Sequence, residues 1–120
     1  MIVAGFGFRS ETTLAALQDA LARAGGAVGV THLATLAAKA PGLEPLGQVL
    51  GVPVIALAAE ALRDQATITR SGRVEALHGT GSVAEAAALA AARPGARLRG
   101  ARAVSADGTA TAAIAEGGIS

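Results

Sequence analysis

The sequence predicts an α/β fold: a three-layer α/β/α single domain with a mixed, mostly parallel sheet that ends in a C-terminal hairpin. Short apolar runs typical of strands alternate with segments of helical period, which favours parallel strands covered by helices. The length of 120 residues fits one domain. Asp107-Gly108 lies between two strand-like runs, residues 97–104 and 109–115, and Asp-Gly is typical of a hairpin turn.

We expect three strands before the hairpin. The first covers residues 2–6, a short and continuous apolar run. The second covers residues 32–36, where apolar and polar residues alternate weakly and β-branched residues occur. The third covers residues 52–57, with Pro53 near its start, where a missing N–H is tolerated.

Helices are predicted between these strands. The first covers residues 11–24, with a leucine stripe on one face, Ser10 as its N-cap and Gly25 just after its end. A loop over residues 37–41 should lead into a shorter helix over residues 43–50. Pro45 fits this helix only in the first turn, because proline cannot donate to a helical hydrogen bond.

Two further helices are expected in the second half of the chain, over residues 58–65 and 83–92. Ser82 and Glu85 have the spacing of a capping box at the start of the second of these helices. Between the two helices, residues 66–77 show no period and are predicted to form a loop.

The composition argues against several functional classes. A net charge of +1 provides no basic field for DNA or a membrane surface, and two phenylalanines offer few stacking platforms for bases. The absence of cysteine excludes disulfides and thiolate ligands. No apolar run is long enough to span a membrane, and no signal peptide is recognisable. We therefore expect a cytoplasmic protein with no cofactor, no metal, no nucleic-acid partner and no membrane partner.

Two glycine-bearing segments before predicted helices are candidate anion sites. Glycines let backbone N–H groups approach a ligand, and the first turn of a helix carries partial positive charge. Arg9 adds a charged donor to the first segment. Neither segment matches a dinucleotide fingerprint or a P-loop, and a simple turn or cap remains the structural alternative for each. The candidate ligand-binding residues are Gly5, Gly7, Arg9 and Ser10 in the first segment, and Gly79, Thr80, Gly81 and Ser82 in the second.

Further candidates follow predicted strands or precede the second glycine segment. Thr35 and Lys39 come at the end of the second strand, where ligands collect in open α/β sheets. Lys39 is the only lysine, and His78 directly precedes Gly79; each is a candidate catalytic acid or base. For Lys39 a solvated loop charge is the alternative. Arg70 and Arg73 fit either a solvated loop or a clamp on the ligand.

Four segments that occur in order resemble the CobE/CbiG carboxy-terminal domain family of cobalamin biosynthesis. The resemblance covers nearly the whole chain, and the run Gly81-Ser82-Val83-Ala84-Glu85 is its most specific part. The segments are residues 5–10, 35–39, 79–88 and 109–115.

The resemblance implies a protein that binds a polycarboxylate precorrin-type tetrapyrrole and assists its processing or transfer. Two-domain members open the lactone of a cobalt-precorrin and release acetaldehyde, so an activity like that of a precorrin or cobalt-precorrin-5A hydrolase is the alternative. Another enzyme of the cobalamin pathway is a possible partner. The family motifs would place ligand-binding residues at Gly5, Gly7, Arg9, Thr35, Lys39, Gly79, Gly81 and Ser82.

The sequence departs from the family pattern at places that could carry acid–base chemistry. Phe8 stands where many members have a cysteine, and Ala37 stands where many have an aspartate. Pro41 and Gly42 stand near the place of a further acidic residue. If those groups are catalytic in other members, this chain binds its ligand without catalysing the reaction.

Overall fold

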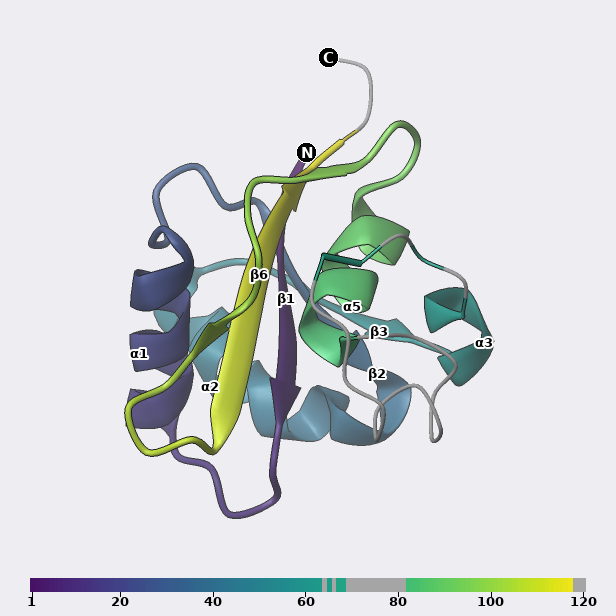
Figure 1. The fold of residues 1–120 in the computed structure, drawn as a ribbon. Coiled ribbons are helices and arrows are strands. Elements are labelled where there is room, and N and C mark those ends of the chain that lie inside the picture. Colours follow the sequence, from purple (N-terminus) through teal and green to yellow (C-terminus); the bar gives the residue numbers. More distant parts are fainter. Residues whose placement is uncertain (64, 66, 69–81, 118–120) are drawn as a thin grey trace.

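The computed structural model describes residues 1–63, 65, 67–68 and 82–117. Strands and helices alternate through the first half of the chain, and three strands follow the last helix (Figure 1). The elements are β1 (Ile2–Phe8), α1 (Leu14–Ala24), β2 (His32–Leu36), the 3-10 helix η1 (Ala37–Lys39), α2 (Ala40–Leu50), β3 (Val54–Leu57), α3 (Ala59–Leu62), α5 (Val83–Ala92), β4 (Arg97–Leu98), β5 (Ala103–Val104) and β6 (Ala110–Glu116).

The sheet is mixed, as expected, and its strand order is β3-β2-β1-β6-β4, with β5 also paired to β6. The β1–β2 and β2–β3 pairs are parallel, whereas the three pairs that involve β6 are antiparallel. The last strand therefore lies in the middle of the sheet, beside the first one (Figure 1). Their register runs from Ile2 opposite Glu116 to Phe8 opposite Ala110.

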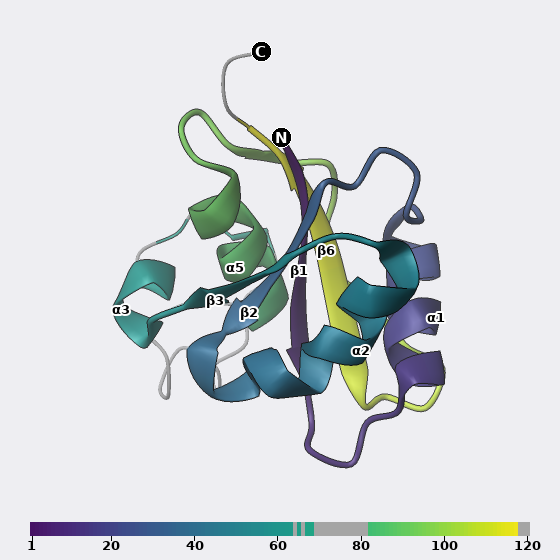
Figure 2. The ribbon, with the colours of Figure 1, turned by 180° about the vertical axis from the view of Figure 1, so that it is seen from behind.

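Helices cover both faces of the sheet, which confirms the three layers. The helices α1 and α2 pack on one face, over a core that includes Phe6, Leu33 and Ile114. The helix α5 packs on the other face, over a core that includes Val3 and Ala34. Figures 1 and 2 show α1 and α5 on opposite sides of the sheet. No helix among the described residues is long and apolar enough to cross a membrane.

The N-cap predicted for the first helix is wrong. Helix α1 begins at Leu14, and its N-cap is Thr13, whose side-chain oxygen accepts a hydrogen bond from the Ala16 N–H at 3.1 Å. Ser10 instead lies in a turn, which the Thr12 N–H closes by donating to the Arg9 carbonyl at 3.0 Å. That turn delays the helix by three residues relative to the predicted start at residue 11. The predicted end at Gly25 is confirmed.

The loop predicted over residues 37–41 is also wrong, because η1 runs directly into α2. Pro41 occupies the first turn of α2, so Pro45 falls inside the helix rather than in its first turn. Pro45 cannot donate to the Pro41 carbonyl. Both prolines are exposed, so this carbonyl lies on the side of the helix that faces water.

The other elements differ less from the prediction. Helix α5 covers residues 83–92 as predicted, and β3 begins just after Pro53. Of the predicted helix over residues 58–65, the described part of the chain contains the four residues of α3. The hairpin is confirmed, with Gly108 at φ 77° and its N–H donating to the Ser105 carbonyl at 2.9 Å. The expected loop over residues 66–77 lies outside the described residues apart from residues 67 and 68.

Candidate ligand-binding groove

A groove of about 370 Å³ opens where β1 ends. Three parts of the chain line it: Gly7 to Arg9 at the end of β1, Val83 at the start of α5, and the β5–β6 hairpin with the preceding Arg102. The start of α5 comes close to β1 here, because a Cβ atom added to Gly7 would lie 3.4 Å from the Val83 Cβ atom. The groove therefore lies at the carboxyl end of a central strand, where open α/β sheets bind ligands.

Both charged side chains that line the groove in the described part of the chain are arginines. Arg9 is exposed and Arg102 is half-buried. The guanidinium group is planar and always charged, and its N–H groups match the two oxygens of a carboxylate. Apolar surface from Phe8, Val83 and Val104 lies beside the two charges. The groove is thus suited to an anion that also carries apolar surface.

The start of α5 adds a third favourable feature for an anion. Ser82 is the N-cap, as predicted, and its hydroxyl accepts a hydrogen bond from the Glu85 N–H at 3.3 Å. Ser82 is fully buried, so its hydroxyl serves the helix rather than the surface. Val83 follows as the first helical residue and lines the groove. The partial positive charge of the helix start therefore acts at the groove wall.

Arg9 is held in place by the hairpin. Its backbone N–H donates to the Thr109 carbonyl at 2.9 Å, and the Thr12 and Thr109 hydroxyls share a hydrogen bond of 2.8 Å. The segment after β1 and the segment before β6 are thereby joined beside the groove, which Arg9 and Thr109 both line.

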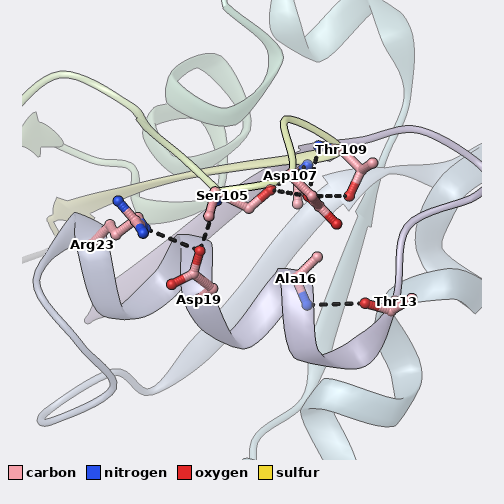
Figure 3. A network of polar contacts seen from close by, with 9 residues as sticks. Thr13, Ala16, Asp19, Arg23, Ser105, Asp107 and Thr109 are labelled. Atoms are coloured by element: carbon pink, nitrogen blue, oxygen red, sulfur yellow. Dashed lines mark hydrogen bonds and ion pairs between the residues drawn. The ribbon is translucent and has the colours of Figure 1, made fainter.

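The hairpin itself is fixed by two aspartates (Figure 3). The Asp107 carboxylate accepts from the Ser105 hydroxyl at 2.7 Å, and from the N–H and hydroxyl of Thr109 at 3.0 and 2.8 Å. Asp19 on α1 accepts from the Ala106 N–H at 2.8 Å and from Arg23 at 2.9 Å. These two contacts, the backbone one first, hold the pKa of Asp19 below its ordinary value. The Thr109 N–H and the two hydroxyls do the same to the pKa of Asp107.

Glu85 ties the start of α5 to two other segments. Its side chain is fully buried, and its two oxygens accept from the Ile68 N–H at 2.6 Å and from the Arg102 N–H at 2.7 Å. A capping box would direct this carboxylate to the backbone of Ser82. Among the described residues it bonds the backbone of Ile68 and Arg102 instead, so only the serine half of the predicted box is present.

The two glycines of the first predicted anion-binding segment are part of the sheet. Gly5 and Gly7 both belong to β1, because β6 pairs with β1 as far as Phe8. Gly7 lines the groove, but Gly5 is buried beneath α5. A Cβ atom on Gly5 would lie 2.1 Å from the Ala84 carbonyl oxygen, so this glycine allows the helix backbone to approach the strand. Ser10 is exposed in the turn that follows Arg9.

Thr35 and Lys39 lie apart from the groove wall. Thr35 is fully buried, and its hydroxyl donates to the Phe6 carbonyl at 2.9 Å. The Lys39 Nζ atom lies 5.6 Å from the centroid of the Phe8 ring. Lys39 therefore lies beside a residue that lines the groove but is not itself part of the lining. A second, apolar hollow of about 210 Å³ lies beyond β2 and β3, lined by Leu36, Ala37, Ala38, Leu57, Ala58 and Ala59.

The remaining candidates lie outside the described residues, and their roles stay predictions. They are Arg70, Arg73, His78, Gly79, Thr80 and Gly81. Within the part of the chain that is described, no group of three or more His, Cys, Asp or Glu residues could hold a metal ion.

Arg102 and Thr109 line the groove but were not predicted as site residues. The Asp-Gly signal placed a turn just before Thr109, but nothing local indicated that this turn would lie against Arg9. Only the pairing of β6 with β1 brings these segments together.

Fold and groove together define a three-layer α/β domain with an arginine-lined groove at the carboxyl edge of its parallel strands. The chain belongs to the family described as cobalamin synthesis G C-terminus, whose model matches residues 2–115. It is therefore a protein of cobalamin biosynthesis, as the sequence resemblance implied.

Solved structures agree with this assignment. The chain is 33% identical to CobE, a protein from the cobalamin (vitamin B12) biosynthetic pathway, over 96% of this chain and 89% of CobE, with a TM-score of 0.79. It is 36% identical to the cobalamin biosynthesis protein chiG from Agrobacterium tumefaciens, over 99% of this chain and all of that one, with a TM-score of 0.69. No curated protein sequence matches.

A third structure shares the fold alone. It is a putative cobalamin biosynthesis protein G homolog from Sulfolobus solfataricus, 16% identical, with a TM-score of 0.69. The match covers 95% of this chain and 36% of that longer one.

Proposed function

We propose that this protein binds a polycarboxylate precorrin-type tetrapyrrole in the groove and assists its processing or transfer. The observation that carries the proposal is the presence of Arg9 and Arg102 in one groove beside the start of α5. Precorrins carry acetate and propionate groups around an apolar ring. The two guanidinium groups suit the carboxylates, and the apolar lining suits the ring edge.

The energies involved are sufficient for specific binding. A hydrogen bond between charged partners contributes about 1.5–3 kcal/mol, and two arginines can each engage one carboxylate. Part of this is offset by side-chain ordering and desolvation, most of all at the exposed Arg9. We therefore expect each arginine to change the dissociation constant by about tenfold.

The test is a fluorescence titration with uroporphyrin, a soluble tetrapyrrole that carries acetate and propionate groups. Arg9→Ala and Arg102→Ala should each weaken binding. Arg93→Ala is the matched control, because Arg93 is exposed at the opposite end of α5 and its replacement removes the same charge. Equal affinities for all four proteins would refute a role for the groove. A further titration with coloured precorrins extracted from producing cells would then identify the natural intermediate.

Lactone hydrolysis is the second candidate function. It draws on one contact: Lys39 Nζ lies 5.6 Å from the ring centroid of Phe8, which lines the groove. An acid–base role for Lys39 predicts that the purified protein alone releases acetaldehyde from a lactone-bearing precorrin and that Lys39→Met stops the release. Unchanged substrate with bound ligand would favour the binding function over hydrolysis.

The proposal includes a cytoplasmic location and a second enzyme of the pathway as partner. Cell fractionation tests the location. Co-elution of the protein with other pathway enzymes, with and without a tetrapyrrole, tests the partner.

A further inference from the structure

We propose that Glu85 is a positioning residue for the groove: its buried carboxylate holds the backbone of Arg102 so that this arginine can meet a carboxylate of the ligand. This inference rests on the proposed function of the groove. It assigns to Glu85 a task beyond the start of its own helix.

The contact that carries the inference joins two segments that are distant in sequence. One Glu85 oxygen accepts from the Arg102 N–H at 2.7 Å, and the other accepts from the Ile68 N–H at 2.6 Å. Glu85 is fully buried, so water does not compete for these oxygens. Charge-assisted bonds of this length are among the stronger hydrogen bonds in proteins.

The N–H of Arg102 is bonded by Glu85 rather than by a strand of the sheet. Residues 99–102 lie between β4 and β5 and belong to neither strand. The Arg99 N–H donates to the Ile114 carbonyl at 2.9 Å, and pairing with β6 resumes only at Ala103. Glu85 therefore supplies the anchor immediately before β5, at the residue whose side chain lines the groove.

A glutamine at this position keeps the size of the side chain but replaces one of the two acceptor oxygens with an NH₂ group. Both carboxylate oxygens of Glu85 accept from backbone N–H groups, whereas an amide offers one oxygen and one NH₂ donor. In the variant Glu85→Gln one backbone N–H would face another donor. The Arg102 backbone would then shift, and a small displacement of a binding group is enough to lose a bidentate contact.

Arg9 provides the internal comparison. Its backbone N–H donates to the Thr109 carbonyl at 2.9 Å, whereas the backbone N–H of Arg102 donates to Glu85. Loss of the Glu85 contacts should therefore act on the contribution of Arg102 and leave that of Arg9 in place. A general loosening of the fold would act on both.

The experiment is a pair of double-mutant cycles with uroporphyrin as the probe. Glu85→Gln is combined once with Arg102→Ala and once with Arg9→Ala, and dissociation constants are measured for every variant. We expect Glu85→Gln to weaken binding about fivefold in the wild-type background and less than about twofold when Arg102 is already alanine. With Arg9→Ala, the two effects should multiply.

Two outcomes would overturn the inference. Multiplying effects in both cycles would overturn the positioning role while leaving the groove as the binding site. Wild-type affinity for both arginine variants would overturn the proposed function and this inference with it. Circular dichroism and thermal unfolding establish that each variant is folded. If Glu85→Gln does not fold, Glu85→Asp, which keeps the charge and shortens the reach, takes its place in both cycles with the same criteria.

Discussion

The backbone of Gly5 on β1 lies directly against the backbone of Ala84 on α5. A Cβ atom added to Gly5 would lie 2.1 Å from the Ala84 carbonyl oxygen and 2.5 Å from the Ala88 nitrogen. The alanine-rich helix can therefore approach the central strand only where that strand has no side chain. This close approach also brings the start of α5 to the end of β1, where Val83 lines the groove.

Gly5→Ala is expected to destabilise the protein by about 3 kcal/mol, because the added methyl group meets backbone atoms that cannot move independently of the helix. Chemical denaturation measures the change. Gly100→Ala is the matched control, since a Cβ atom at Gly100 meets nothing within 4 Å. Similar stabilities for the two variants would show that α5 is free to move away from β1.

Thr13→Ala is expected to destabilise the protein by about 1 kcal/mol, because the Ala16 N–H loses its capping partner. Ser10→Ala should leave the free energy of unfolding nearly unchanged, since Ser10 lies in the preceding turn and is exposed. Urea denaturation of both variants compares the two candidate caps directly. A larger effect from Ser10 than from Thr13 would restore the helix start that the sequence suggested.

Acid should destabilise the protein partly through Asp107. Hydrogen bonds from Thr109 and Ser105 hold the pKa of Asp107 below its ordinary value of 3.8, so the folded state favours the charged carboxylate. This contribution to the free energy of unfolding is complete at neutral pH, where Asp107 is ionised in both the folded and the unfolded state. It is lost as the pH falls below about 4 and through the folded-state pKa. Asp19 and Glu116, whose pKa values are also lowered, add to the same trend.

Asp107→Asn should therefore unfold at a lower denaturant concentration at pH 7 and show a shallower loss of stability toward about pH 3 than the wild type. Denaturation midpoints across this range provide the measurement. Glu44→Gln is the control, because Glu44 is exposed and forms no hydrogen bond with the described residues. An Asp107→Asn profile parallel to the wild-type profile would contradict the assigned role.

Binding of a polycarboxylate tetrapyrrole should weaken as salt is raised from about 0.05 to about 0.5 M, because ions screen the exposed Arg9 and the half-buried Arg102. The dependence should be smaller in Arg9→Ala and in Arg102→Ala, and unchanged in Arg93→Ala. Titrations at several salt concentrations give the slopes. Wild-type slopes in both groove variants would mean that the ligand carboxylates lie elsewhere.

Elements specified by neighbouring residues could be predicted from the sequence. Helix α5 begins at Val83 because Ser82 accepts the hydrogen bond of an N–H three residues away, and the hairpin turns at Gly108 because that residue adopts a positive φ. The first turns of α1 and α2 were predicted less well. At Ser10 and Thr13 two good caps compete. Thr109, which lies far along the chain, bonds both Arg9 and Thr12 and so holds the segment between them outside the helix.

By itself, the sequence determined the α/β class and the family, and it predicted Arg9 as a donor to an anion, because these inferences depend on local patterns and on residue chemistry. Only the tertiary structure decided that β6 lies beside β1. That pairing draws Gly7 into the sheet, and it brings Thr109 to Arg9. The pairing of β6 with β1 could not be predicted from the sequence because several strand orders satisfy the same local patterns. The difference between those orders lies in contacts between distant segments, such as the pairing of Ile2 with Glu116.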